Sequence, residues 1–239
     1  MGFHKTGCLI CGRDLHYFDP ARTLACSICG REHQTAASCA DGHFVCDRCH
    51  AQPGYESITR QARQTDSRDP AAIAREMMAG EFINMHGPEH HYLVVAALLA
   101  AYKNSDGDID LDKTLAVAAQ RTKKVPGGIC GHWGACGAGI GSGIFVSLVT
   151  GASPLSAEEW RLANEMTSAS LGVIAKNGGP RCCKRDTWLA LLTAADFARE
   201  RLGVPLEKPA AVRCSFFGKN PTCLKQNCLF YPPADAAPR

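Results

Sequence analysis

The stretch HGPEHHYLVVAALLAAYK, residues 86–103, decides the fold class of this 239-residue chain. Its Gly87-Pro88 pair predicts a sharp entry into a helix that runs from Glu89 to about Lys103. That helix is apolar on nearly every face, and such a helix belongs at the centre of a domain. We therefore expect a mainly α-helical domain built around it.

Signals for further helices lie on both sides of this stretch. Asp69 is an N-cap followed by Pro70 at the first helical position, and it predicts a helix to about Ala79. Ser156 and Glu159 have the spacing of a capping box. Alternation typical of strands is scarce. Three further helices are expected over residues 111–121, 156–176 and 183–201.

Changes in composition divide the chain into four parts. Residues 1–53 hold seven cysteines and little that could form a core, which predicts a zinc module of the zinc-knuckle or treble-clef type. Residues 54–68 are polar and are predicted to be a linker. Residues 69–206 form the expected helical domain that binds metal and substrate. Residues 207–239 are expected to be a cysteine-containing tail packed on that domain.

The composition excludes several classes of protein. Hydrophobic residues make up 46% and charged residues 21%, which is ordinary for a folded protein and excludes general disorder. The net charge of +3 is too small to indicate nucleic-acid binding. The longest apolar run is too short to span a membrane. No secretory signal precedes the first cysteines, so we expect a cytoplasmic protein whose 14 cysteines serve as metal ligands and not as disulfides.

Two five-residue segments share the form Cys-x-Ile-Cys-Gly and stand 18 positions apart, at residues 8–12 and 26–30. Two cysteines three positions apart on a tight turn can both reach one ion. Two later pairs, Cys39 with His43 and Cys46 with Cys49, complete the ligands for two tetrahedral zinc ions. The pairing can be sequential (first pair with second, third with fourth) or cross-braced (first with third, second with fourth), and His50 is an alternative to His43. The predicted metal ligands are Cys8, Cys11, Cys26, Cys29, Cys39, His43, Cys46 and Cys49.

A cluster of polar residues marks the mouth of the central helix. His86, Glu89, His90 and His91 place three imidazoles and a carboxylate within six residues. The macrodipole at a helix N-terminus favours the carboxylate and lowers the pKa of an imidazolium. The cluster therefore predicts acid/base catalysis or metal binding, with polar capping of the helix end as the alternative.

A glycine-rich segment follows Cys130 and His132 and begins at Cys136, with the sequence CGAGIGSG over residues 136–143. Glycines deny the segment side-chain packing and expose its backbone N–H groups to an anion or a cluster sulfide. Gly137 and Gly139 are accordingly predicted to contact a cofactor. Close packing of helices at these small residues is the other interpretation.

Seven cysteines lie outside the zinc module and could hold one [4Fe–4S] cluster. Of the adjacent pair Cys182 and Cys183, one is expected to bind the cluster and the other to be reactive or buried. Their position at a helix start beside Arg181 and Lys184 predicts a lowered thiol pKa. Three more have the spacing Cys-x8-Cys-x4-Cys in the tail. The predicted ligands are Cys130, Cys136, Cys182, Cys183, Cys214, Cys223 and Cys228.

Together, the histidine cluster, the Cys130–Gly143 segment, the Cys182-Cys183 pair and the tail cysteines resemble an uncharacterised family of prokaryotic Cys/His-rich proteins, over roughly residues 69–232. The resemblance implies a partner enzyme of the radical-SAM or methyltransferase type, because family members occur fused with or beside such proteins. More loosely, the thiols and glycines are similar to iron–sulfur lyases of the serine dehydratase and cysteine desulfidase type. There, three cysteines hold a [4Fe–4S] cluster whose open iron binds the substrate.

Two functions from different classes fit these features. The first is an iron–sulfur enzyme of the lyase, desulfurase or sulfur-transfer type, which acts on a small anionic substrate that can contain sulfur. The second is a metal-binding accessory protein that docks a partner enzyme through its zinc module. In the enzyme, His86, Glu89, His90, His91 and His132 would supply acid/base groups, and Arg181 or Lys184 would hold the anion.

Overall fold

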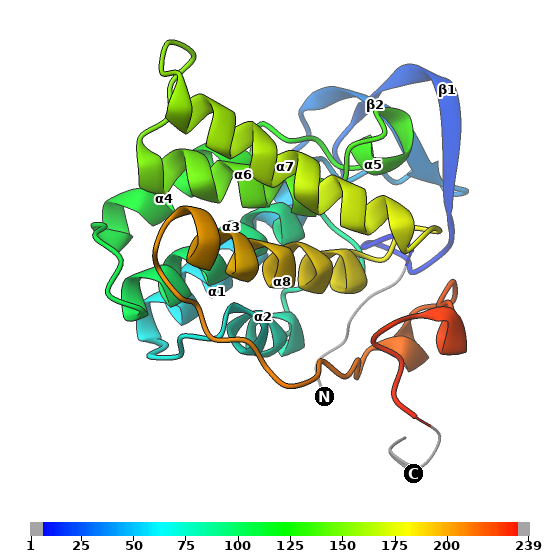
Figure 1. The fold of residues 1–239 in the computed structure, drawn as a ribbon. Helices are drawn as coiled ribbons and strands as arrows, with labels where there is room; N and C mark the ends of the chain where they lie inside the picture. Colours follow the sequence, from blue (N-terminus) through cyan, green and yellow to red (C-terminus); the bar gives the residue numbers. More distant parts are fainter. Residues whose placement is uncertain (1–6, 234–239) are drawn as a thin grey trace.

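The computed structural model describes residues 7–233, which form a helical body with a small module of two strands at one end (Figure 1). We call residues 7–50 the N-terminal module. No helix within the described residues is both long and apolar enough to cross a membrane. The elements are β1 (Leu15–Ala25), β2 (Glu32–Cys39), α1 (Asp47–Gln64), α2 (Pro70–Ala79), α3 (Glu89–Asn104), α4 (Leu111–Thr122), α5 (Ile129–His132), α6 (Gly137–Thr150), α7 (Glu158–Lys176), α8 (Cys183–Arg201), and the 3-10 helices η1 (Phe217–Lys219) and η2 (Lys225–Asn227).

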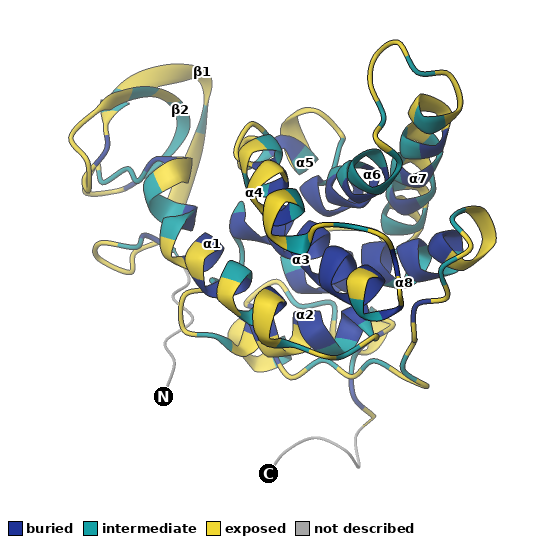
Figure 2. Ribbon diagram, turned by 90° about the vertical axis from the view of Figure 1, so that its left-hand side faces the viewer, coloured by how far each residue is buried: buried dark blue, intermediate teal, exposed yellow. Residues whose placement is uncertain are grey.

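Helix α3 is the centre of the body, as its apolar sequence predicts. Every residue from Glu89 to Tyr102 is buried, and α3 contacts α1, α2, α4, α6 and α8. Figure 2 shows α3 and α8 as largely buried helices with more exposed helices around them. Each Leu or Val side chain of α3 that is withdrawn from water contributes roughly 1.5–3 kcal/mol to the free energy of folding. The mainly helical fold class is confirmed.

The helix α2 begins where its N-cap signal predicts. The Asp69 carboxylate accepts hydrogen bonds from the backbone N–H groups of Ala71 (2.8 Å) and Ala72 (3.1 Å). Pro70 occupies the first helical position, where no N–H donor is needed. These local contacts define the start of the helix without help from the tertiary structure.

Helix α7 begins differently from the prediction. Its first residue is Glu158 and its N-cap is Ala157. The Ser156 hydroxyl instead accepts a hydrogen bond from the Ser153 N–H (2.9 Å) and donates one to the Ser153 carbonyl (2.9 Å). The expected capping box is therefore absent, because the preceding turn uses the serine.

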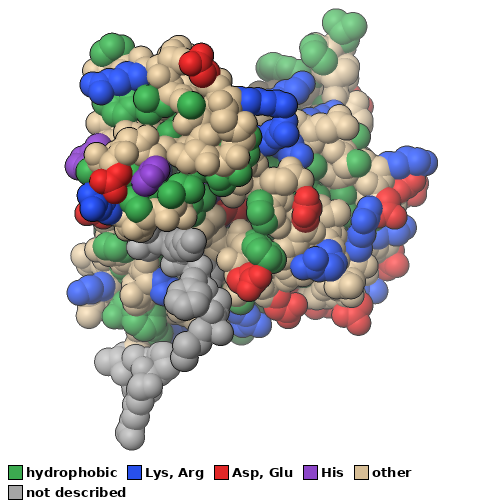
Figure 3. All heavy atoms as spheres, turned by 180° about the vertical axis from the view of Figure 1, so that it is seen from behind, with side chains coloured by type: hydrophobic (Ala, Val, Ile, Leu, Met, Phe, Trp, Pro, Cys, Tyr) green, Lys and Arg blue, Asp and Glu red, His purple; other side chains and the backbone are tan. Residues whose placement is uncertain are grey.

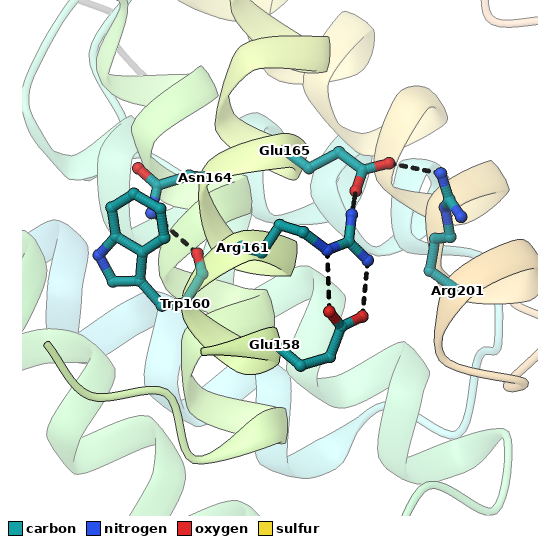
Figure 4. Close-up of polar contacts among 6 residues, drawn as sticks. All are labelled: Glu158, Trp160, Arg161, Asn164, Glu165 and Arg201. Carbon is teal, nitrogen blue, oxygen red and sulfur yellow. Dashed lines mark hydrogen bonds and ion pairs between the residues drawn. The ribbon is translucent and has the colours of Figure 1, made fainter. Parts of the chain in front are cut away.

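Exposed ion pairs join α7 to α8 (Figure 4). Arg161 pairs with Glu158 and Glu165 on α7, and Glu165 also pairs with Arg201 of α8 at 2.7 Å. Because these side chains are solvent-exposed or nearly so, each pair contributes only ~0–1 kcal/mol. None of these four residues lines either of the two cavities described below.

Helix α1 corrects the prediction of a linker over residues 54–68, since it continues to Gln64. Its buried residues include Ala51, Tyr55, Ile58 and Ala62, a helical stripe that packs on α3. The ring of Tyr55 stacks on that of Tyr92, with 4.6 Å between centroids. Polar residues on the other face make the segment look like a linker in sequence, but the buried stripe packs this helix against α3 of the body.

The C-terminal segment, residues 202–233, contains only the two short 3-10 helices. It follows the surface of the body and buries Phe216 and Phe230 against Trp188 of α8. The Cys214 N–H donates to the Phe230 carbonyl (2.8 Å), which closes the segment into a loop.

Candidate functional site: two metal groups and a histidine-lined cavity

The eight predicted ligands of the N-terminal module meet in two groups of four, each of which could hold a metal ion. In the first group, the Cys11 and Cys39 sulfurs are 3.7 Å apart, and Cys39 Sγ is 3.5 Å from His43 Nδ1. In the second, Cys29 Sγ and Cys46 Sγ are 3.9 Å apart. The first group consists of Cys8, Cys11, Cys39 and His43, and the second of Cys26, Cys29, Cys46 and Cys49.

The pairing, which spacing leaves open, is cross-braced. The first ligand pair joins the third and the second joins the fourth, because β1 and β2 form an antiparallel hairpin that places Leu15 opposite Cys39. Backbone N–H groups of Ile10 and Cys46 donate to the sulfurs of Cys8 and Cys26, at 3.4 and 3.3 Å. Such N–H donors stabilise thiolates and suit them as metal ligands.

A cavity of about 250 Å³ lies between the module and the helical body. The module and α1 contribute Tyr17, His43 and His50 to its wall, and the body contributes residues from the start of α3, α5, α6 and α8. Two contacts hold the two walls together. Arg181 donates a hydrogen bond to the Tyr17 hydroxyl (2.7 Å), and the Gly127 N–H donates to the Asp47 carboxylate (2.7 Å).

Glu89 does not line this cavity but lies directly behind its histidines, with no exposed surface. One carboxylate oxygen accepts a hydrogen bond from the Asn84 N–H (2.9 Å), and the other is 3.5 Å from His50 Nδ1. Burial alone would raise the pKa of this carboxyl group, but the nearby His50 imidazole and a backbone N–H outweigh it and lower the pKa to about 2. Glu89 is therefore an ionised carboxylate that acts on its neighbours and does not itself reach the cavity.

Two cavity histidines have their Nδ1 atoms occupied by backbone carbonyl acceptors: His90 Nδ1 lies 3.2 Å from the Gly87 carbonyl, and His91 Nδ1 lies 3.2 Å from the Val125 carbonyl. His50 Nδ1 lies 3.5 Å from the Glu89 carboxylate without a hydrogen bond to it. An acceptor at Nδ1 holds the proton there and leaves Nε2 with a free lone pair. His90 Nε2 is buried and has no hydrogen-bond partner. These imidazoles are thus arranged as bases or as ligands.

Burial keeps the histidines at the mouth of α3 neutral. Burial and the nearby charge of Arg181 lower the pKa of His86 to about 4. Burial and the charge of Lys184 hold the pKa of His90 well below its usual value, and burial also lowers the pKa of His91. Near neutral pH all three are therefore uncharged.

Three thiols open onto the same cavity: Cys130, Cys136 and Cys183. Burial and the neighbouring Asp186 raise the pKa of the Cys136 thiol to about 12, and burial raises that of Cys183. The lowered pKa predicted for the adjacent cysteines is wrong, because burial also raises the pKa of Cys182 and outweighs the helix terminus. A metal would have to displace the thiol protons.

The charged residues of the site separate into two roles. Arg181 is exposed at the cavity and faces it, whereas Lys184 is fully buried and does not line it. Of the two, only Arg181 can meet an anion there. Arg185 and Asp186 form a buried ion pair at 3.0 Å beneath the thiols.

The glycines of α6 also divide. Gly137 lines the cavity against His91. Gly139 does not: a Cβ there would lie 2.7 Å from the Leu171 side chain of α7, so its role is helix packing and not the predicted cofactor contact.

His132, on α5, is exposed and lies at the cavity edge. Cys182 and the three tail cysteines line a different, smaller cavity.

Sequence reasoning missed His50 and Asp186 as members of this site. The one sequence signal for His50 was that the module offers both His43 and His50 where its two four-ligand groups require one histidine, so either His43 or His50 had to be free of the metal groups. His43 belongs to the first group that could hold a metal ion, and His50 faces Glu89.

Comparison with known proteins identifies one family. The profile of a family of unknown function (DUF5714) matches residues 58–231, which include α3, the glycine-rich helix and all three tail cysteines. No curated protein and no solved structure matches the chain.

Proposed function

Because the chain belongs to the DUF5714 family of unknown function, we propose a function from its own residues: it is a metal-dependent enzyme that acts on a small anionic substrate. The reaction takes place in the cavity between the N-terminal module and the helical body. A sulfur-containing substrate, in a reaction of the lyase, desulfurase or sulfur-transfer type, suits the thiols of this cavity.

The observation that carries this proposal is the pair formed by buried Glu89 and His50. A carboxylate that orients an imidazole from behind is a recurring arrangement in catalytic sites, because it selects the tautomer whose Nε2 accepts a proton. Glu89 is a positioning residue here, and His50 and His90 are the groups that face the substrate. Burying an ionised carboxylate costs several kcal/mol without partners, and the Asn84 N–H, the N-terminus of α3 and the nearby His50 imidazole reduce this cost.

The electrostatics and size of the cavity indicate its substrate. Arg181 supplies a permanent positive charge, and the N-terminus of the 14-residue helix α6 begins at Gly137 in the cavity wall. Both favour an anionic group. A volume of about 250 Å³ suits a metabolite of modest size.

The metals of this enzyme are zinc and iron. Zinc fits the two groups of the module, because Zn–S bonds of about 2.3 Å place tetrahedral sulfurs ~3.8 Å apart. Cys130, Cys136 and Cys183 are three thiols on one cavity, the number that leaves one iron of a [4Fe–4S] cluster without a protein ligand. When bound, such a cluster supplies a Lewis acid or a sulfur carrier. The protein residues orient the anion, accept protons and limit access of water.

The test compares Glu89→Gln with Glu165→Gln in anaerobically purified protein. Each is incubated with pools of small sulfur-containing anions, and consumption of any compound is followed by mass spectrometry. We expect wild type and Glu165→Gln to convert the same compound, and Glu89→Gln to lose at least tenfold in rate with unchanged metal content. Glu165 is a suitable control because its ion pairs lie on the exposed face of α7 and α8 (Figure 4). Equal rates in all three proteins would contradict the role of Glu89.

A second candidate function has its own observation. Several large apolar side chains of the module are exposed, with exposed fractions of 45% for Ile10, 53% for Tyr17 and 57% for Ile28. Hydrophobic side chains are visible over this part of the surface in Figure 3. Such a surface suits an accessory protein that docks a partner enzyme, of the radical-SAM or methyltransferase type, in the cytoplasm. If Ile28→Asp abolished function in vivo while Glu89→Gln did not, this second function would replace the first.

A further inference from the structure

A second cavity lies between the start of α8 and the C-terminal segment, and four cysteines line it. Its volume is about 20 Å³, and Trp188, Phe216 and Phe230 contribute aromatic walls. One of the four cysteines is the N-cap residue of α8, and the other three come from a loop more than thirty positions later. The cysteines are Cys182, Cys214, Cys223 and Cys228.

The spacing of the four sulfurs does not suit a single ion. Among the residues that the structure describes, three or more potential ligand atoms lie within 4.8 Å of one another only in the two groups of the N-terminal module. A single tetrahedral zinc ion requires sulfurs ~3.8 Å apart and leaves no room for a water-sized void between them. A [4Fe–4S] cluster holds its four cysteine sulfurs farther apart, because the iron–sulfide core lies between them.

The backbone around these thiols is arranged for sulfur anions. The Phe216 N–H donates to Cys214 Sγ and the Lys225 N–H donates to Cys223 Sγ, each at 3.3 Å. Both bonds span two residues, as does the bond from Ile10 to Cys8 in the first metal group. Cys182 lies at the positive end of the 19-residue helix α8.

Positive charge is also present without a partner. Lys184 is fully buried, and its Nζ has no hydrogen-bond partner. It lies 4.8 Å from the centre of the Phe216 ring, which forms part of the cavity wall. Arg185 also lines the cavity, but Asp186 already balances its charge at 3.0 Å. Four thiolates around a doubly positive cluster carry a net charge of about −2, which the charge of Lys184 would offset in part.

From these four observations we propose that Cys182, Cys214, Cys223 and Cys228 bind a [4Fe–4S] cluster in a site of its own, separate from the histidine-lined cavity. The adjacent residues Cys182 and Cys183 face different cavities, so the seven cysteines outside the module form two sites and not the single one that their sequence suggests. All four irons have a cysteine ligand, and the cluster fastens the C-terminal segment to α8. This inference goes beyond the proposed function and does not rest on it.

The first experiment counts metals. Wild type, the double variant Cys214→Ala/Cys223→Ala and the control Cys130→Ala/Cys136→Ala are purified anaerobically and supplied with ferrous iron and sulfide. We expect the tail variant to lose four irons and four sulfides per chain relative to wild type, while the control keeps at least four of each. Bound zinc should be the same in all three. In wild type and control, reduction with dithionite should give the electron paramagnetic resonance signal of a reduced [4Fe–4S] cluster.

Other results would overturn the inference. Wild type without iron and sulfide contradicts it before any variant is made, so a poorly folded variant cannot hide the answer. Loss of one zinc from the tail variant would assign the site to zinc. Iron that is lost from the control and kept by the tail variant would assign the only cluster to the cavity, which would support the proposed function and contradict this inference.

Limited digestion with trypsin provides a second readout on the unmodified chain. Lys219 and Lys225 are exposed in the C-terminal segment, which has little regular secondary structure of its own. If the cluster fastens this segment, cleavage there should be at least tenfold faster after iron is removed with a chelator, with unchanged helical circular dichroism. Equal cleavage rates with and without iron would contradict a cluster at these four cysteines.

Discussion

At the scale of single residues, the histidine-lined cavity depends on one absent side chain. A Cβ at position 137 would lie 2.2 Å from Cδ2 and 2.3 Å from Nε2 of His91, far inside contact distance. His91 cannot simply turn away, because its Nδ1 is held by the Val125 carbonyl and its ring is buried. Gly137 is thus part of the site through the space that it leaves for the imidazole.

The prediction for this residue uses a glycine in another helix as its control. Gly137→Ala should lower the free energy of unfolding by about 1–3 kcal/mol, because the methyl group overpacks a buried site. Gly172→Ala, at a position in α7 with no atom within 4 Å of the new methyl group, should raise it by roughly 0.5–1 kcal/mol. Denaturation with urea measures both. Similar shifts of the same sign would show that His91 does not occupy the place described.

At the scale of elements, the hairpin of β1 and β2 is fastened at both ends. The first metal group joins the residue pair before β1 to the end of β2, and the second joins the turn of the hairpin to the start of α1. The hairpin by itself would be only marginally stable in water, so metal ions bound at the two groups would supply much of the folding energy of the module. Because α1 continues into the body, the module is also held against α3.

Cross-bracing makes a prediction about pairs of variants. Cys8→Ser and Cys39→Ser should each remove one of two bound zinc ions, and the double variant should still hold one, because both residues belong to the same group. Cys8→Ser combined with Cys26→Ser should hold none. Zinc is measured by mass spectrometry after dialysis. Sequential pairing would give the reverse pattern, with none in the first double variant and one in the second.

At the scale of the whole molecule, the cavity makes stability depend on pH. His86 has a folded pKa of about 4 against 6.5 for an ordinary histidine. Between these values the unfolded chain binds a proton that the folded protein does not, so stability is fully present above pH 6.5 and is lost as the pH falls towards 4. Burial of His90 and His91 acts in the same direction.

Replacement of His86 should weaken this dependence. We expect His86→Gln to lose less stability than wild type between pH 6.5 and 4, with a difference in slope of up to about 1.4 kcal/mol per pH unit. Urea denaturation across this range measures the slope, and comparison of two proteins with identical module ligands cancels any loss of metal at low pH. His16→Gln, at an exposed position of β1, should behave like wild type. Parallel curves for all three proteins would show that His86 is not kept neutral by burial.

Local signals sufficed for much of the fold and part of the site. The apolar residues of α3, the Asp69 cap and the Cys-x2-Cys pairs act through neighbours a few positions away, so the mainly helical fold class, α2, α3 and the eight module ligands could be predicted from sequence. The linker prediction failed because α1 carries a narrow apolar stripe beside a wide polar face. The stripe is buried only by contact with α3, which is distant in sequence.

The chain by itself therefore determined which residues could bind metal and which helix had to be buried, since spacing and hydrophobicity are properties of short segments. Only the tertiary structure decided how they combine. The register of a hairpin selected the cross-braced pairs. The packing of α1 on α3 placed His50 against Glu89, and the start of α8 directed adjacent Cys182 and Cys183 to different cavities. These outcomes depend on contacts between residues far apart in sequence, and no local pattern encodes such distances.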